Sequence, residues 1–206
     1  MIKTIVFDVG DVLIRFRYRD HMRDLGFSDE ALEELSNRMV LTEFWSEMDR
    51  GAKMEADAVE HFTARMPEYA EEIRTFWAHT EGLVREFPYA EGLVKGLKDA
   101  GYGVYVLSNY PEETAKRHWP VFRFLPHADG YIISAYEKLV KPDPRLYRLL
   151  ESRFGVNLSE CLFIDDRQVN VDGAEAVGMQ GLLFRGYEEL LKDLEKLGIR
   201  PVLPSA

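Results

Sequence analysis

FDVGDVL, residues 7–13, ends a short apolar run with a carboxylate. The run TIVFDV at 4–9 has the composition of a buried strand, and Asp8 stands near its end. An unpaired carboxylate beside a buried strand is costly, so it needs a partner or a chemical task. We therefore interpret this stretch as the first strand of a sheet and as a candidate site at the end of that strand.

Other short apolar runs resemble the first and are separated by helical patterns. The runs are GVYVLSN at 103–109, GYIISA at 130–135, CLFIDD at 161–166 and MQGLLF at 179–184. Between and after them, helical spacing of apolar residues runs over 89–100, from Pro142 to Leu150, over 169–177 and over 187–197. This alternation predicts an α/β fold with a Rossmann-like parallel sheet.

Residues 15–85 have a different pattern, with helical signals and no convincing strand. Ser28 can cap a helix that carries Asp29 and Glu30 in its first turn, and 41–49, 53–66 and 67–80 also favour helix. We expect a helical-bundle cap at 15–85, inserted after the first strand of a core made of 1–14 and 86–206. Phe44, Trp45 and Trp77 are expected in the cap's own small core, with one of them facing the cleft as the alternative.

The composition limits the functional class. The chain has 206 residues and a net charge of -10, which argues against a nucleic-acid partner held through its phosphates. No apolar run approaches the roughly 20 residues that span a bilayer, and no signal peptide is evident. The single cysteine, Cys161, is expected as a buried strand residue. We expect a cytoplasmic protein without a membrane partner, as a monomer or alternatively a dimer.

Polar side chains follow three of the predicted strands where each strand ends. They are Asp8, the pair Ser108 and Asn109, and the pair Asp165 and Asp166. In an open parallel sheet, ligands bind beyond the carboxyl ends of the strands. Converging carboxylates repel one another unless a cation lies between them, and Mg²⁺ prefers oxygen ligands. With Lys141 as a counter-charge, the set predicts phosphoryl transfer through an aspartyl-phosphate.

The ordered motifs resemble those of the haloacid dehalogenase superfamily of hydrolases over nearly the whole chain. The matching segments are FDVGDVL, VYVLSN, LVKPDPRLY around Lys141, and LFIDDRQVNVDGAEAVGM. The helical insert also falls where the small cap of that superfamily lies. Its segment FWSEMDRGAKM, 44–54, resembles the subgroup of bacterial sugar-phosphate phosphatases, glucose-1-phosphate phosphatases included.

The resemblance implies a role for each matched residue. Asp8 would be the nucleophile and a metal ligand, and Asp166 a direct ligand of Mg²⁺. Asp165 would lie beside it, binding the metal directly or through water and facing Lys141. Ser108 and Asn109 would bind the transferring phosphate, and Lys141 would neutralise charge on the nucleophile and the phosphate. In addition, Asn170 would steady the fourth motif.

Gly10 departs from the pattern of most phosphatases of this superfamily, which have a second Asp two residues after the nucleophile. Gly10 retains the backbone carbonyl that would bind the metal but lacks the side-chain acid, whose loss typically costs about 10²–10⁴-fold in rate. Asp11 is either a substitute acid and base or a turn residue. The resembling subgroup also has glycine here, and a good leaving group needs less protonation.

Three functions remain open. The first is a Mg²⁺-dependent phosphatase of a small phosphorylated metabolite, such as a sugar phosphate. The second is a metal-free 2-haloacid dehalogenase, which the pair Asp165 and Asp166 disfavours because it clusters negative charge. The third is a catalytically silent relative that binds phosphorylated ligands, which Gly10 alone supports. Arg15, Arg17 and Arg19 are expected in a solvated linker or in a hinge that meets the substrate.

Overall fold

The sheet predicted from the apolar runs is present in the structure, a computed structural model that describes residues 1–203. It has five parallel strands in the order β5-β4-β1-β6-β7. Their bounds are β1 Thr4–Phe7, β4 Gly103–Ser108, β5 Gly130–Ile133, β6 Cys161–Asp165 and β7 Gln180–Leu183. Because β1 is central and pairs with both β4 and β6, the carboxyl ends of these three strands meet at one edge.

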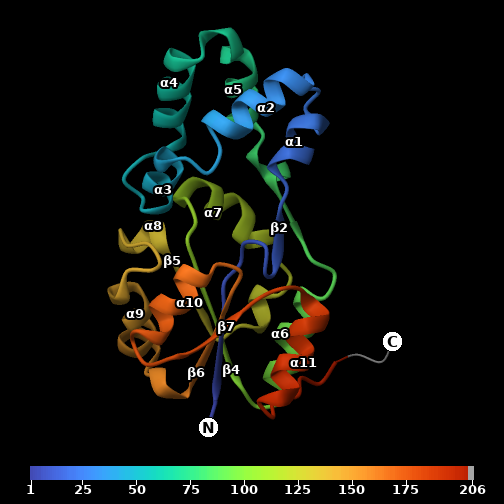
Figure 1. Ribbon diagram of the computed structural model, residues 1–206, viewed down its shortest axis with the longest axis vertical. Helices are drawn as coiled ribbons and strands as arrows, with labels where there is room; N and C mark the ends of the chain where they lie inside the picture. Colours follow the sequence, from blue (N-terminus) through green and yellow to red (C-terminus); the bar gives the residue numbers. More distant parts are fainter. Residues whose placement is uncertain (204–206) are drawn as a thin grey trace.

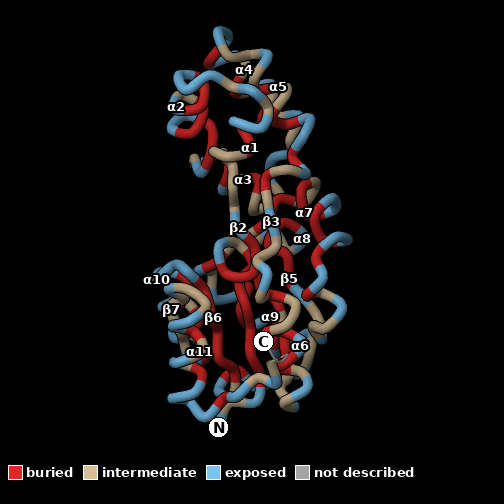
Figure 2. The backbone as a smooth tube through the Cα atoms, turned by 90° about the vertical axis from the view of Figure 1, so that its right-hand side faces the viewer, coloured by how far each residue is buried: buried red, intermediate tan, exposed pale blue. Residues whose placement is uncertain are grey.

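Helices cover both faces of the sheet (Figure 1). On one face lie α6 (Ala90–Asp99) and α11 (Tyr187–Lys196), and on the other lie α9 (Pro144–Phe154) and α10 (Gln168–Glu175). Successive side chains of β1 point to opposite faces of the sheet. Ile5 and Phe7 pack towards α6 and α11, whereas Val6 packs towards α9. Figure 2 shows the strands as the buried centre of this part of the molecule. Cys161 is fully buried in β6, as expected.

Two short helices stand at the edge of the sheet where the chain leaves β4 and β5. They are α7 (Glu112–His118) and α8 (Ser134–Glu137), and the sequence patterns did not predict them. The single-turn 3₁₀ segments are Pro67–Tyr69, Thr80–Leu83, Trp119–Val121, Leu125–His127 and Leu158–Glu160. Within residues 1–203, no helix is long and apolar enough to cross a membrane.

The segment between β2 and β3, residues 17–83, is here called the helical insert. It contains α1 (Tyr18–Asp24), α2 (Asp29–Arg38), α3 (Glu43–Asp49), α4 (Glu55–Arg65) and α5 (Ala70–Ala78). As predicted, Ser28 caps α2, its hydroxyl accepting from the backbone N–H of Ala31 at 3.1 Å. Trp45 and Trp77 are buried in a hydrophobic cluster that belongs to the insert itself, and Phe44 packs against it.

The expectation that 15–85 holds no strand was wrong at both ends. β2 (Ile14–Phe16) and β3 (Val84–Glu86) pair antiparallel and form a two-stranded ladder that leads into and out of the insert. Three residues are too few to show a periodicity in the sequence. Of the linker arginines, Arg15 lies in β2, and Arg17 binds Gly82 and Asp24. Within residues 1–203 none of Arg15, Arg17 and Arg19 lines the cavity described below.

Candidate active site

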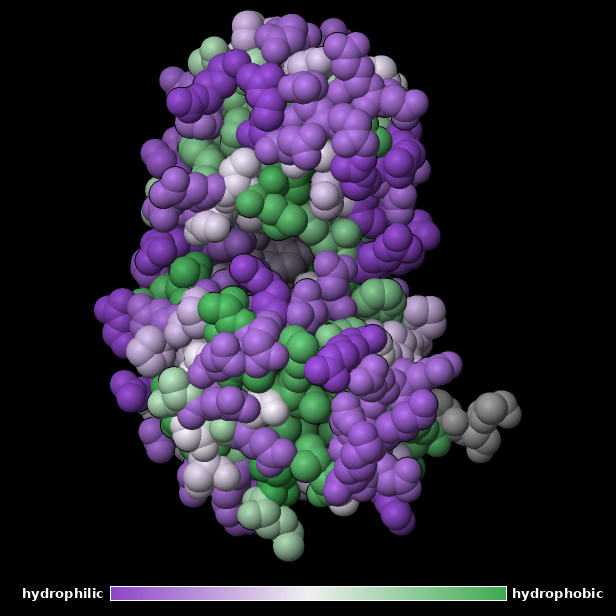
Figure 3. Space-filling view, in the orientation of Figure 1, coloured by the Kyte–Doolittle hydropathy of each residue, from purple (hydrophilic) through white to green (hydrophobic). Residues whose placement is uncertain are grey.

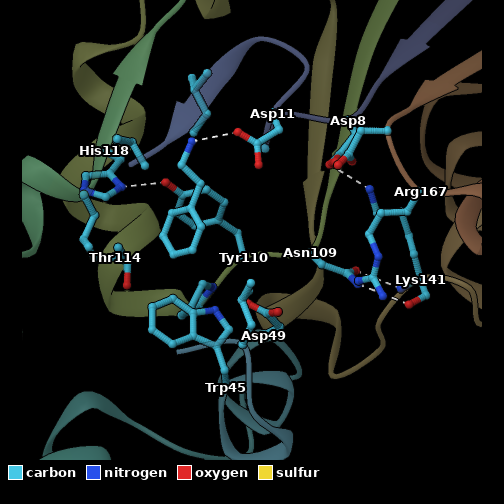
Figure 4. Close-up of a pocket in the computed structure, with 18 of the residues that line it drawn as sticks. Asp8, Asp11, Trp45, Asp49, Asn109, Tyr110, Thr114, His118, Lys141 and Arg167 are labelled. Atoms are coloured by element: carbon cyan, nitrogen blue, oxygen red, sulfur yellow. Dashed lines mark hydrogen bonds and ion pairs between the residues drawn. The ribbon is translucent and has the colours of Figure 1, made fainter. Parts of the chain in front are cut away.

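A cavity of about 160 Å³ lies where the helical insert meets the carboxyl ends of β1, β4 and β6. Figure 3 shows the surface hollowed at this level, with apolar residues bordering the hollow on the insert side. The apolar part of the lining consists of Ile14, Phe16, Leu41, Trp45, Leu83 and Val84. Its polar part includes Asp166 and, labelled in Figure 4, Asp8, Asp11, Asp49, Asn109 and Lys141. A volume of this size holds several water-sized groups, enough for a phosphate and a small organic substituent.

Lys141 joins two of the predicted site carboxylates. Its Nζ lies 2.7 Å from Oδ1 of Asp8 and 2.7 Å from Oδ2 of Asp165. All three side chains are buried, with residue exposures of 7% for Asp8, 4% for Lys141 and 0% for Asp165. A buried ammonium is tolerated only when it is paired, so each of these charges depends on the others. The structure thus brings together residues that lie far apart in the sequence.

Asp165 is saturated by protein donors. Besides Lys141, the backbone N–H of Arg167 donates to its Oδ1 at 2.9 Å, and the amide of Asn170 donates to both oxygens at 3.0 and 3.1 Å. Asn170 therefore ties α10 to the end of β6, in keeping with the role expected for it. Within residues 1–203, by contrast, no donor meets Oδ2 of Asp8, and no other residue donates a hydrogen bond to the carboxylate of Asp166.

The donor set fits a hard divalent cation. Asp8, Asp165 and Asp166 each offer a carboxylate oxygen, and these atoms lie within 4.8 Å of one another. Three carboxylates face one lysine, so the cluster has an excess of negative charge that a divalent cation balances. Because the lone pairs of Asp165 already accept protein donors, the oxygens left open are those of Asp8 and Asp166. Gly10 lines the cavity beside them.

Burial and mutual repulsion shift the ionisation of this cluster. Burial raises the pKa of the Asp8 carboxyl, and Lys141 opposes that rise. Burial, with repulsion from Asp165 and Asp11, raises the pKa of Asp166 to about 6. Burial acts to lower the pKa of Lys141, but Asp8 and Asp165 outweigh it and raise this pKa, so the amine stays charged. Strongly perturbed groups in one cleft are typical of functional sites.

Ser108, the last residue of β4, and Asn109, which follows it, make different contacts. The side chain of Asn109 holds the backbone of Lys141, accepting from its N–H at 2.8 Å and donating to its carbonyl at 3.1 Å. One amide hydrogen of Asn109 remains for a ligand. Ser108 is buried, its hydroxyl has only a 3.4 Å contact to the carbonyl of Asn109, and it is not among the residues that line the cavity. A role of Ser108 in phosphate binding therefore stays a prediction.

Asp11 has the geometry of a turn residue. Its backbone is left-handed, with φ of +49°, and its Oδ1 accepts from the N–H of Phe16 at 3.0 Å, which fixes the start of β2. Asp11 also lines the cavity. Its carboxylate is thus already engaged in local structure, as the simpler of the two interpretations anticipated.

Sequence reasoning missed several residues that line the cavity. Asp49, Tyr110, Thr114, His118 and Arg167 are among them. Tyr110 and His118 are linked, since the phenol oxygen lies 2.6 Å from Nδ1 and Nε2 lies 2.9 Å from the carbonyl of Thr80. Asp49 lies in FWSEMDRGAKM, a segment that the sequence analysis singled out without identifying the residue. Figure 4 shows Asp49 and Trp45 entering from the insert, opposite Asp8 and Lys141.

Comparison with known proteins agrees with this geometry. A family model described as haloacid dehalogenase-like hydrolase matches residues 2–178. A sesquiterpene phosphatase of Aspergillus oryzae is 27% identical, over 87% of this chain and 88% of the relative. A flavin mononucleotide hydrolase of Arabidopsis thaliana is also 27% identical, over 97% of this chain and 79% of the relative.

Solved structures share the fold. A HAD family enzyme from Bacteroides thetaiotaomicron has a TM-score of 0.72 at 22% identity, covering 94% of this chain and 98% of that protein. The same enzyme has been crystallised in a complex with magnesium and inorganic phosphate, and that structure has a TM-score of 0.70. At this level of identity the likeness establishes the fold alone.

Proposed function

The chain belongs to the haloacid dehalogenase-like hydrolases, and from that premise we propose that it is a Mg²⁺-dependent phosphatase of a small phosphorylated metabolite. The observation that carries the proposal is the meeting of Asp8, Asp165 and Asp166 beside Lys141. The relatives that are a sesquiterpene phosphatase and a flavin mononucleotide hydrolase support a phosphate ester as substrate. We further propose that 1–14 and 86–206 form the catalytic core and that 15–85 is its cap.

In the proposed reaction an oxygen of Asp8 attacks the phosphorus atom. The bond from phosphorus to the leaving oxygen breaks, and water then hydrolyses the aspartyl-phosphate. Lys141 neutralises negative charge on Asp8 and on the phosphate, and Asp165 holds Lys141 in place. Asn109, through its free amide hydrogen, and Ser108 are the proposed phosphate contacts.

Asp8, Asp166 and the carbonyl of Gly10 are the proposed Mg²⁺ ligands, with Asp165 acting through a water. The hydrogen bonds support this division, because Asp165 accepts four contacts from other residues, whereas Asp166 accepts none from another residue within residues 1–203. When bound, Mg²⁺ would neutralise charge on the transferring phosphate. The magnesium and phosphate bound by the Bacteroides thetaiotaomicron enzyme are consistent with this proposal.

A sugar phosphate is the substrate that the sequence resemblance favours. The cavity supports a second candidate, a phosphate ester with an apolar organic group. Apolar side chains line the cavity together with the acidic cluster, and Trp45 and Phe16 are among them. Aromatic faces accept the apolar face of a sugar as well as a hydrocarbon, so the two candidates share the same wall and differ in the hydroxyls they present.

A substrate panel with Mg²⁺ tests the proposed function. We expect hydrolysis of p-nitrophenyl phosphate and of at least one glycosyl, isoprenyl or flavin phosphate, abolished by EDTA. Asp8→Asn is expected to lower turnover by up to about 10⁶-fold, the scale seen when a nucleophile is removed. Asp172→Asn, an exposed change on α10, is the matched control and keeps wild-type activity.

Two outcomes would contradict the proposal. Halide release from a 2-haloacid without Mg²⁺, together with an inert phosphate panel, would identify a dehalogenase. Binding of phosphorylated ligands without turnover of any of them would identify the silent relative.

A further inference from the structure

We propose that Asp49, which enters the cavity from the helical insert, acts as the general acid and base. Gly10 has no side chain that could take this role. The inference rests on the proposed phosphatase function and deepens it. It assigns a second carboxylate to the reaction, from the opposite wall of the cavity. Asp8 and Lys141 come from the sheet side, whereas Asp49 is the last residue of α3.

The carboxylate of Asp49 has no structural task in the protein. Within residues 1–203 no group donates a hydrogen bond to it, although its backbone carbonyl is bonded. A negative charge at the C-terminal end of a helix is also disfavoured by the helix dipole, so local stability does not account for an aspartate here. An aspartate that lines a cavity without a partner is free to interact with a ligand.

The backbone around Asp49 is fixed by a relay of hydrogen bonds from the core. The hydroxyl of Ser134, fully buried at the start of α8, donates to the carbonyl of Asp49 at 2.5 Å. The same hydroxyl accepts from the N–H of Tyr110 at 2.9 Å, in the loop after β4. One hydroxyl thus ties the loop that follows β4 to the residue we propose as the acid. General acids need this kind of fixed placement.

The next turn of the insert is docked just as closely. Gly51 has a left-handed backbone with φ of +69°, and a Cβ there would lie 2.4 Å from the carbonyl oxygen of Ala135. Lys138 donates to the carbonyl of Gly51 at 2.8 Å. The close approach that glycine permits brings the end of α3 against α8, so Asp49 is positioned by the core as well as by its own helix.

The ionisation of Asp49 suits an acid. Burial raises the pKa of its carboxyl to about 8, with Lys141 opposing and Asp8 adding to the rise. This shift favours the protonated form of the carboxyl, which is the form that a general acid needs. A general acid works best when its pKa lies near the working pH.

In the proposed reaction Asp49 donates a proton in the first step and accepts one in the second. In the first step Asp8 bonds to phosphorus, the bond from phosphorus to the leaving oxygen breaks, and the Asp49 proton passes to that oxygen to release an alcohol. In the second step the Asp49 carboxylate takes a proton from water as its oxygen bonds to phosphorus. The bond from phosphorus to Asp8 breaks, inorganic phosphate leaves, and both aspartates return to their initial states.

The test is the dependence of kcat/KM on the leaving group. With Mg²⁺ present, Asp49→Asn is expected to lower kcat/KM by less than about tenfold for p-nitrophenyl phosphate but by about 10²–10⁴-fold for phenyl phosphate. A good leaving group needs little protonation, whereas a poor one needs the acid. Because the variant also lacks the base for the second step, it should give a burst of nitrophenolate as phosphoenzyme accumulates. Asp49→Glu should restore part of the activity.

Asp11→Asn is the matched comparison, since an amide oxygen still accepts from Phe16 at that position. An equal loss for all leaving groups in Asp49→Asn, or a rise in KM alone, would overturn the proposal and assign Asp49 to substrate binding. A leaving-group dependence in Asp11→Asn instead would identify Asp11 as the acid. Both results differ from failure of the proposed function, in which the wild-type protein hydrolyses none of these esters. Thermal unfolding of each variant confirms that it is folded.

Discussion

His118, a buried residue of the cavity wall, is held in a defined ionisation state by its hydrogen bonds. Its two ring nitrogens are both engaged, with the phenol of Tyr110 at 2.6 Å and the carbonyl of Thr80 at 2.9 Å. The carbonyl can only accept, so Nε2 donates to it and Nδ1 accepts from Tyr110 in the neutral ring. The residue therefore links α7 of the core to the insert as an uncharged group.

Because His118 is buried as a neutral ring, we expect the free energy of unfolding to fall on mild acidification. Burial lowers the pKa of His118 in the folded protein below its ordinary value of about 6.5. As the pH falls below about 6.5, His118 of the unfolded chain takes up a proton before His118 of the folded protein does, so the free energy of unfolding decreases. His118→Gln should show a shallower decrease in urea unfolding between about pH 7.5 and about pH 5.5. Parallel curves for the two proteins would contradict this.

At the scale of elements, the docking of the insert on α8 sets the position of one wall of the cavity. The loop after α3 approaches the core through Gly51, Ser134 and Lys138. A second junction lies nearby, where the side chain of Arg117 on α7 bonds Glu55 of the insert and Thr80. Two short helices that follow sheet strands thus hold the insert against the site.

A pair of glycines tests that docking. Gly51 and Gly26 both have left-handed backbones, but only Gly51 has protein atoms where a Cβ would go. We expect Gly26→Ala to cost roughly 1–2 kcal/mol of stability from backbone strain and to leave activity unchanged. Gly51→Ala should in addition displace the end of α3 and lower kcat/KM, more for phenyl phosphate than for p-nitrophenyl phosphate. Equal activities for the two variants would show that the docking does not affect the site.

The sequence predicted the elements that carry continuous apolar runs and missed those that depend on tertiary contacts. The inner strands β1 and β6 are fully buried and β4 mostly so, and each therefore shows as an apolar run, as do the partly buried edge strands β5 and β7. The ladder of β2 and β3 is too short to show a period, and α7 is too polar to show an apolar face. Asp8, Asp165 and Asp166 could be placed together because strand ends share an edge. Asp49 could not be placed with them from the sequence, since its position depends on how α3 docks on α8.

At the scale of the whole molecule, the site is a composite of two parts of the chain that the sheet topology and the insert bring face to face. The ends of β1 and β6 place Asp8, Asp165 and Asp166 at one edge of the sheet, beside Lys141 from the loop before α9. The insert and the β2–β3 ladder close that edge with an apolar wall, and the insert adds the carboxyl group of Asp49. Closing a site in this way excludes water while the phosphoryl group is transferred, which strengthens each charge interaction inside.

The most direct measurement traps the intermediate. The protein is mixed with Mg²⁺ and a substrate found in the panel, quenched with borohydride, digested and sequenced by mass spectrometry. Borohydride reduces an aspartyl-phosphate to homoserine, so we predict homoserine at position 8 and unmodified aspartate at positions 11, 49, 165 and 166. Turnover with no reduction at position 8, or reduction at another aspartate, would contradict the assignment of Asp8 as the nucleophile.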